Sequence, residues 1–286
     1  MDLTAGPNNS QQINESTYQP VNKSTSHLIN YTLHLADNSL ILGHRNSEWA
    51  GHGPILEQDI AISNIALDLI GQSRNLYQYG AELINANPHH STFNIDYGRP
   101  ITEDDLAYLR EERGYKNCLL VEQPNGDWAQ TILRQFFFSS FQYFFYKELL
   151  NSKDAQLAAI AEKSLKETTY HLRWSSEWVI RLGDGTEESN KRISKAVDEL
   201  WMFTNELFEP ADYESTLIED GTGINISTLK AKWQEKVQST FEEATLQLPE
   251  TNPNQSGGKN GIHSEHLGFI LAEMQYLQRA YPNSQW

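Results

Sequence analysis

The sequence has a single cysteine, an excess of acid over base and no long hydrophobic run. Cys118 has no partner for an intramolecular disulfide, and one thiol cannot form a Cys-x-x-Cys metal site. This cysteine content is typical of a reducing compartment, so we expect a cytoplasmic protein. No stretch approaches the roughly 20 apolar residues of a membrane-spanning helix. The N-terminus lacks the basic and apolar segments of a signal peptide. We therefore expect no membrane association and no secretion.

Basic residues are outnumbered by acidic ones, 22 against 38, which gives a formal net charge of -16 at pH 7. The average field of such a chain repels a polyphosphate, so we expect no nucleic-acid partner. With 286 residues, of which 38% are hydrophobic and 21% charged, the chain is long enough to bury a substantial core. The composition is that of a globular protein.

Apolar residues recur at helical spacing over most of the chain, and we find no convincing pair of strands. Four long helices are predicted at 27–49, 55–85, 127–151 and 154–182. We expect a loop at 119–126, and shorter helices after Thr102 and at 186–208, 227–248 and 263–281. Residues 1–26 are almost entirely polar and are predicted to be a disordered tail. The remainder, 27–286, is predicted to be a single all-α domain: a four-helix bundle core with additional C-terminal helices.

The fourth long helix has an inward stripe that is apolar at both ends and polar in the middle. The stripe reads Leu157, Ala161, Ser164, Thr168, His171, Ser175, Trp178 and Leu182. The inward face of 127–151 likewise includes Gln135 and Ser139 between apolar residues. Bundles bind metals and cofactors at mid-height through inward side chains. This pattern indicates that the bundle holds, or once held, a group at that level.

Several unusual segments carry a resemblance to a known family. They are 35–38, 47–52 (Ser-Glu-Trp-Ala-Gly-His), 67–72 (Leu-Asp-Leu-Ile-Gly-Gln), 120–126 (Leu-Val-Glu-Gln-Pro-Asn-Gly) and 261–268 (Gly-Ile-His-Ser-Glu-His-Leu-Gly). They resemble the C-subunits of bacterial phenylacetyl-CoA 1,2-epoxidases, over about residues 27–286. The resemblance implies a ferritin-like fold. It also implies a partner, the paralogous catalytic A-subunit, which is a di-iron oxygenase that converts phenylacetyl-CoA to a ring epoxide. A homodimer alone and a hetero-oligomer with this catalytic partner are expected on the same basis.

A dinuclear carboxylate site in such a bundle requires one Glu from each of two helices and a Glu-x-x-His from each of the other two. The resemblance assigns these six positions to Glu48, Leu69, Gln72, Ser139, Thr168 and His171. Only the first and last keep the identity of a ligand. We therefore interpret the site as vestigial, with no catalytic, metal-binding or cofactor-binding residue in this chain and with di-iron expected in the catalytic A-subunit.

Two carboxylates, Asp68 and Glu167, each precede a required position by one residue. One residue corresponds to a rotation of about 100° around the helix, so we interpret them not as ligands but as partners that support the inward residues or connect the helices. Buried polar groups require partners, so His171 is predicted to hydrogen-bond Glu48, Gln72 or Thr168. Glu48, beside a helix end, could equally be a surface charge.

Two further clusters contain residue types that also occur in functional sites. His263, Glu265 and His266 have ligand-like spacing but begin a predicted helix, so we interpret them as a helix cap or a subunit contact. The aromatic run 136–145 is predicted to be core or interface, covered on more than one side.

The predicted function is a non-catalytic structural subunit that binds and supports the di-iron catalytic subunit in aerobic phenylacetate degradation. The alternatives are a di-iron or di-manganese oxygenase with an atypical ligand set, and an unrelated interaction bundle.

Overall fold

The computed structural model describes residues 23–87, 99–249, 254–282 and 284, and within these ranges it contains helices and no strand. The four long helices are α1 (Lys23–Ser47), α2 (Leu56–Asn85), α5 (Trp128–Leu149) and α6 (Ala155–Gly183). The predictions of an all-α fold and of four long helices are confirmed. Helix α1 begins four residues before its predicted start. The rest of the predicted tail, residues 1–22, lies outside the described residues, and the single-domain division stays a prediction.

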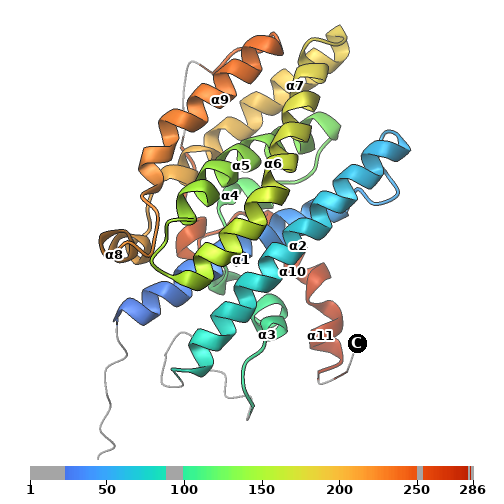
Figure 1. The fold of residues 1–286 in the computed structure, drawn as a ribbon. Coiled ribbons are helices and arrows are strands. Elements are labelled where there is room, and N and C mark those ends of the chain that lie inside the picture. The colour runs from blue at the N-terminus through green and yellow to red at the C-terminus, as the bar shows by residue number, and fades with distance from the viewer. Residues whose placement is uncertain (1–22, 88–98, 250–253, 283, 285–286) are drawn as a thin grey trace, which may run out of the picture.

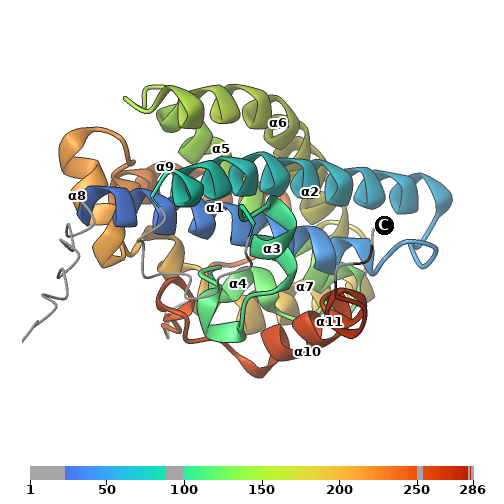
Figure 2. The same cartoon turned by 90° about the horizontal axis from the view of Figure 1, so that it is seen from below.

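The long helices pack as two hairpins, α1 with α2 and α5 with α6, and α2 lies along α6 to close the bundle (Figures 1 and 2). Local sequence fixes where two of these helices begin. The Asp127 carboxylate accepts a hydrogen bond from Gln130 N at 3.1 Å, and Asp154 accepts one from Leu157 N at 2.9 Å. Such N-caps satisfy backbone donors that the first helical turn leaves free.

Shorter helices surround this core. They are α3 (Glu103–Tyr108), α4 (Leu119–Glu122), α7 (Glu187–Leu200), α8 (Asp212–Asp220), α9 (Lys230–Glu243), α10 (Glu265–Met274) and α11 (Tyr276–Ala280). Helices α7 and α9 pack on α5 and α6, as Figure 1 shows. The additional C-terminal helices that the sequence predicts are therefore confirmed. Within the described ranges, no helix is both long enough and apolar enough to span a membrane.

Several predicted boundaries were wrong. The segment 119–126 is not all loop, because α4 forms where the buried Glu122 carboxylate accepts from the Ser264 backbone at 2.7 Å. The helix predicted at 186–208 ends as α7 at Leu200 and continues as two short 3-10 turns. Tertiary contacts, which a local pattern does not encode, decide these ends.

Two C-terminal helices also differ from expectation. Ser227 does not cap a helix; it lies in a 3-10 turn, and α9 starts at Lys230 and ends at Glu243. The chain then reverses at Thr245, whose φ is 56°. The helix predicted at 263–281 is divided into α10 and α11 at Gln275, whose side-chain amide donates to Arg110 O at 2.9 Å and to Tyr115 Oη at 3.0 Å.

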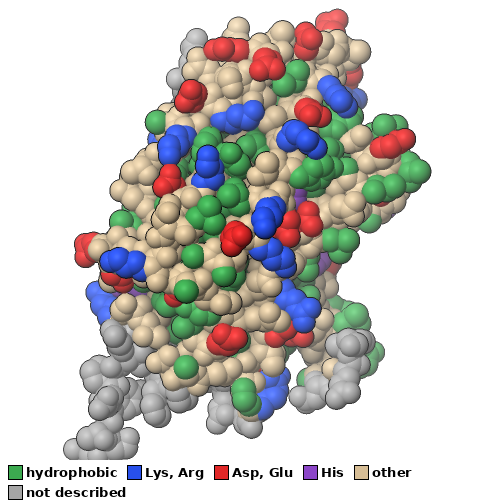
Figure 3. All heavy atoms as spheres, in the orientation of Figure 1, with side chains coloured by type: hydrophobic (Ala, Val, Ile, Leu, Met, Phe, Trp, Pro, Cys, Tyr) green, Lys and Arg blue, Asp and Glu red, His purple; other side chains and the backbone are tan. Residues whose placement is uncertain are grey.

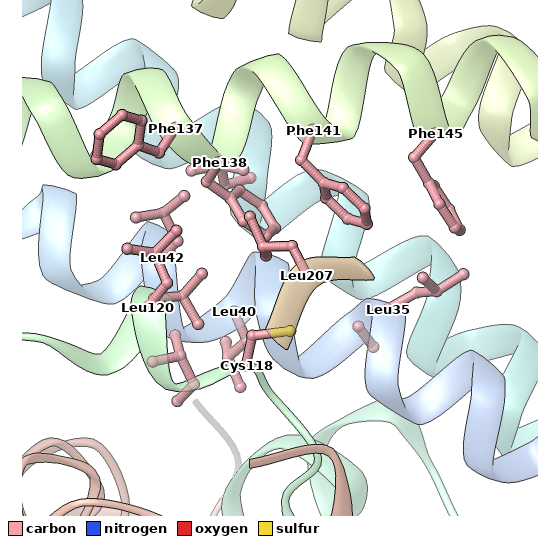
Figure 4. Close-up of a cluster of buried hydrophobic side chains, with 14 of the residues drawn as sticks. Leu35, Leu40, Leu42, Cys118, Leu120, Phe137, Phe138, Phe141, Phe145 and Leu207 are labelled. Carbon is pink, nitrogen blue, oxygen red and sulfur yellow. The ribbon is translucent and has the colours of Figure 1, made fainter. Parts of the chain in front are cut away.

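The aromatic run of α5 forms the centre of the core on two sides. Phe138, Phe141 and Phe145 point toward α1 and the segment that holds Cys118 (Figure 4). On another side Phe137 packs against Trp233 of α9, with ring centroids 5.7 Å apart. The prediction that this run is packed on more than one side is confirmed. Helix α5 is held by these contacts, and its polar face is thereby fixed toward α2 and α6.

Candidate functional site

The polar waist is a layer of buried polar side chains at mid-height of the bundle. Its members are at most 3% exposed. They are Gln72 of α2, Gln135, Ser139, Gln142 and Tyr146 of α5, and Thr168 and His171 of α6. The spacing 135, 139, 142, 146 places the α5 members on one helix face. Four of the six positions that the resemblance assigns to metal ligands thus meet here: Gln72, Ser139, Thr168 and His171.

The imidazole of His171 is bonded to Asp68, and the predicted partners Glu48, Gln72 and Thr168 were wrong. His171 Nε2 lies 3.0 Å from Asp68 Oδ2. An ionised carboxylate only accepts, so Nε2 carries the hydrogen. The other ring nitrogen, Nδ1, is buried without a hydrogen-bond partner among the described residues. Asp68 therefore fixes the orientation of the ring from outside the waist, where its own side chain is 37% exposed.

The amide of Gln72 connects three helices. Its Nε2 donates to Glu167 Oε2 of α6 at 2.9 Å. Its Oε1 accepts from Gln142 Nε2 at 3.1 Å and from the hydroxyl of Tyr146 at 3.3 Å. Burial raises the pKa of Tyr146 to about 12, so the phenol stays protonated and remains a donor at neutral pH. Both polar ends of Gln72 are thus satisfied within the protein.

The four residues Asp68, Gln72, Glu167 and His171 form a reciprocal contact, here called the cross-helix brace. Each helix supplies one carboxylate and, four residues later, one inward donor. Because α2 and α6 run antiparallel, Asp68 meets His171 and Glu167 meets Gln72. The prediction that the two displaced carboxylates are partners between helices is confirmed. The rotation of one residue turns each of them away from the waist and toward the opposite helix.

Hydroxyl and amide groups of α5, α1 and α6 complete the waist. Ser139 Oγ accepts from Gln135 Nε2 at 2.7 Å, and Gln135 Oε1 accepts from Asn46 Nδ2 of α1 at 2.7 Å. Thr168 Oγ1 lies 3.5 Å from Gln142 Oε1, which makes it a weak donor. The sequence placed Gln135 on the inward face of its helix, whereas it gave no signal for Gln142 or for Asn46.

Glu48 does not join this network. It follows the last residue of α1, its side chain is 35% exposed, and it bonds Arg45 Nη1 at 3.0 Å and Asn125 Nδ2 at 2.7 Å. Its place matches the open alternative of a surface charge at a helix end. From α1, Asn46 reaches the waist through its bond to Gln135.

Leu69 is also buried, and it faces α1. A Cβ added at Gly43 would lie 3.2 Å from Leu69 Cβ, so the two backbones approach closely there. The position assigned to the first carboxylate of α2 is therefore filled by hydrocarbon packed on a glycine. A charged oxygen at this place would be desolvated without a partner.

The donor set of the waist does not fit a pair of iron ions. Such a centre requires converging carboxylates and imidazoles. Here the amides and hydroxyls bond one another, and the buried atoms without a partner among the described residues include His171 Nδ1 and Asn46 Oδ1. In the described part of the chain no three His, Cys, Asp or Glu side chains group closely enough to hold a metal ion. The His263 cluster does not converge either, because His263 is buried against Glu122, with Nδ1 and Oε2 2.9 Å apart.

Comparison with known proteins agrees with the resemblance noted in the sequence. The chain is 46% identical over 256 residues to the 1,2-phenylacetyl-CoA epoxidase C-subunit from Escherichia coli strain K12. That alignment covers 90% of this chain and 98% of the relative. The family model described as "Phenylacetic acid catabolic protein" matches residues 9–286. The predicted ferritin-like helical fold is confirmed by this match together with the observed bundle. The chain therefore belongs to the phenylacetic acid catabolic protein family.

Proposed function

We propose that this chain is a non-catalytic structural subunit of a multicomponent epoxidase that acts on phenylacetyl-CoA in aerobic phenylacetate degradation. It binds and supports a catalytic subunit that carries the di-iron centre, and it holds no metal or other cofactor of its own. It works in the cytoplasm. The similarity to a known epoxidase C-subunit supports the complex to which we assign it.

One observation carries the non-catalytic role: the polar waist is closed by its own hydrogen bonds. Gln72 uses its amide nitrogen and its amide oxygen on protein partners, and Ser139 is bonded to Gln135. A metal entering this layer would have to break several buried hydrogen bonds, each of which costs about 1–3 kcal/mol to leave unmade. It would gain neutral amide and hydroxyl oxygens in place of carboxylates. The waist thus favours a rigid scaffold over a reaction centre.

Iron analysis of the isolated full-length chain tests the metal-free state. After anaerobic loading with Fe(II) and desalting, we expect far less than one iron per chain, and no absorption typical of an oxo-bridged pair after exposure to air. A content near two irons per chain would overturn the proposal and favour the oxygenase alternative.

Turnover in the assembled complex tests the structural role separately. The chain is co-expressed with a paralogous subunit that carries both Glu-x-x-His motifs, and the complex is assayed with phenylacetyl-CoA and its reductase. We expect His171→Gln, whose amide can still donate to Asp68, to leave the rate per assembled complex within about twofold. The variant Ser175→Ala, on the same face of α6, is the matched control for repacking. A loss of a hundredfold or more with intact assembly would show that His171 serves the reaction.

A further inference from the structure

A cavity lies between α3 and α11. The two helices lie next to each other in Figures 1 and 2, and residues from both line a space of about 580 Å³. Pockets that bind small organic molecules commonly measure about 300–1,000 Å³, so this space is large enough for one. No member of the polar waist is among the described residues that line it. The cavity is therefore separate from the candidate site described above.

Aromatic and aliphatic side chains contribute to both sides of this cavity. Tyr108 and Leu109 line it on the side of α3, and Tyr281 and Pro282 line it on the side of α11. Tyr108 and Leu109 are half-buried, whereas Tyr281 is 57% exposed, so a ligand can reach the cavity from solvent. The face of a tyrosine ring carries partial negative charge and attracts cations. These walls suit a ligand that combines an apolar part with a positive charge.

Three consecutive carboxylates begin α3, and two of them are paired within the chain. Glu103 accepts a hydrogen bond from Gln78 Nε2 at 3.0 Å. Asp105 accepts from both terminal nitrogens of Arg99, at 2.7 and 2.8 Å. The carboxylate of Asp104 lines the cavity and has neither a hydrogen bond nor an ion pair within the described part of the chain. The cavity thus offers one acidic side chain with which a ligand can pair.

Neighbouring charges make the electric potential in the cavity negative. Partial burial and the charge of Glu103 raise the pKa of Asp104. Burial and the charge of Asp104 raise the pKa of Tyr108. Arg99 does not reverse the sign, because its guanidinium forms an ion pair with Asp105. A cation in the cavity would relieve the repulsion on Asp104, whereas an anion would add to it.

Several carboxylates elsewhere on the surface have a basic partner. On the face shown in Figure 3, Lys and Arg side chains are interspersed among Asp and Glu. Glu148 pairs with Lys232 at 2.9 Å, and Glu188 pairs with Arg192 at 2.7 Å. The chain as a whole has a formal net charge of -16 and attracts cations from solution. An external cation would supply the partner that Asp104 lacks among the described residues.

We propose that the cavity between α3 and α11 binds an organic cation, which is a primary ammonium or guanidinium group on an apolar chain. The charged group pairs with the Asp104 carboxylate, and the apolar chain packs against Tyr108, Leu109 and Tyr281. A free amine and the side chain of a lysine or arginine in another protein present the same chemistry. The inference does not rest on the proposed function, since neither the metal content nor the assembly enters it.

An NMR titration of the full chain with three five-carbon ligands tests the charge that the cavity selects. Pentylamine, pentanol and pentanoate are positive, neutral and negative at pH 7. We expect pentylamine to bind with a dissociation constant of about 1 mM, which is typical for a ligand of this size. Pentanol should bind about tenfold more weakly, because it lacks the ion pair. Pentanoate should show no saturable binding.

Substitutions locate the binding. Asp104→Asn keeps the size of the side chain and removes its charge, and we expect it to weaken the binding of pentylamine about tenfold. The matched control is Asp198→Asn, which removes an exposed carboxylate on α7 and should leave the affinity unchanged. Circular dichroism shows whether each variant stays folded.

A further ligand distinguishes the two sources of the cation. The methylamide of acetylated lysine presents the lysine side chain without charges on its backbone. If it binds as tightly as pentylamine, the cavity accepts a lysine side chain of another protein; if pentylamine alone binds, the cavity accepts a free amine. The proposal is overturned if neither ligand shows saturable binding or if pentanoate binds as tightly as pentylamine. Native affinity in Asp104→Asn overturns it as well.

Discussion

Replacing Gln72 with glutamate places a second carboxylate against Glu167 in the core of the bundle. The native amide is 1% exposed and donates to Glu167 at 2.9 Å. The substituted side chain keeps the size and the acceptor for Gln142 and Tyr146 but loses the donor. The change therefore removes one hydrogen bond of the cross-helix brace and places a buried carboxylate against the partly buried carboxylate of Glu167.

The magnitude follows from these two effects. A hydrogen bond to a charged group contributes about 1.5–3 kcal/mol, and desolvation of an unpaired buried carboxylate adds to the loss. We expect Gln72→Glu to lower the free energy of unfolding at pH 7 by about 3–4 kcal/mol. The loss should shrink at acid pH, because a protonated carboxyl can again donate to Glu167.

A compensating substitution makes the test specific. Glu167→Gln in the same chain supplies an amide donor to the carboxylate at position 72, which then accepts from three donors. We expect the double variant to recover about 2 kcal/mol beyond the sum of the single effects. A matched control exists on the same helix, where Gln78 Nε2 donates to Glu103 at 3.0 Å near the surface. The reversed pair Gln78→Glu with Glu103→Gln should show coupling of about 0.5 kcal/mol or less.

Urea unfolding followed by circular dichroism gives the four free energies of each cycle. All variants should keep the native m value, which is the slope of the unfolding free energy against urea concentration. Changes in the urea midpoint then report changes in stability. A coupling energy below about 0.5 kcal/mol at positions 72 and 167 would refute the reasoning, because the brace would then not connect α2 to α6 energetically.

Three further predictions concern groups outside the brace. Burial lowers the pKa of His263, but its hydrogen bond to Glu122 and the Glu122 charge outweigh burial, so the pKa lies above 6.5. The His263–Glu122 pair therefore contributes its full stabilisation of the folded state below pH 6.5, and this contribution is lost as the pH rises through the raised pKa. The variant His263→Gln should abolish that part of the pH dependence of the unfolding free energy, measured with urea. Burial, reinforced by Glu206, raises the pKa of the Cys118 thiol, so a disulfide reagent should label it only in denatured protein. Trp233→Phe removes a 2.9 Å hydrogen bond to Phe137 O and should lower the urea midpoint by an amount equivalent to about 2 kcal/mol.

Helix positions were predictable where local signals agree with burial. Asp127 and Asp154 act as N-caps, and the inward stripe of α6 is buried from Leu157 to Ser175. The prediction failed where a distant contact decides a boundary. Glu122 ends α4, and its carboxylate accepts a hydrogen bond from the backbone of Ser264, which is more than a hundred residues away in the sequence.

The candidate site shows the same division. Helical spacing identified the inward positions Thr168, His171 and Gln72, because side-chain direction follows from the helix period. Spacing could not assign the partner of His171, since that depends on how α2 is rotated and shifted against α6. In the structure this arrangement brings Asp68, and not Gln72, within 3.0 Å of His171 Nε2.

The sequence by itself determined the helical class, the polar middle of α6 and the family, because these depend on residue identity and on periodicity within one segment. Only the tertiary structure decided that Asp68 and Glu167 cross to the opposite helix and that Glu48 lies outside the waist. The physical reason is that a contact between side chains, and the burial of a side chain, depend on the surfaces of two helices. The sequence of one helix specifies only its own surface.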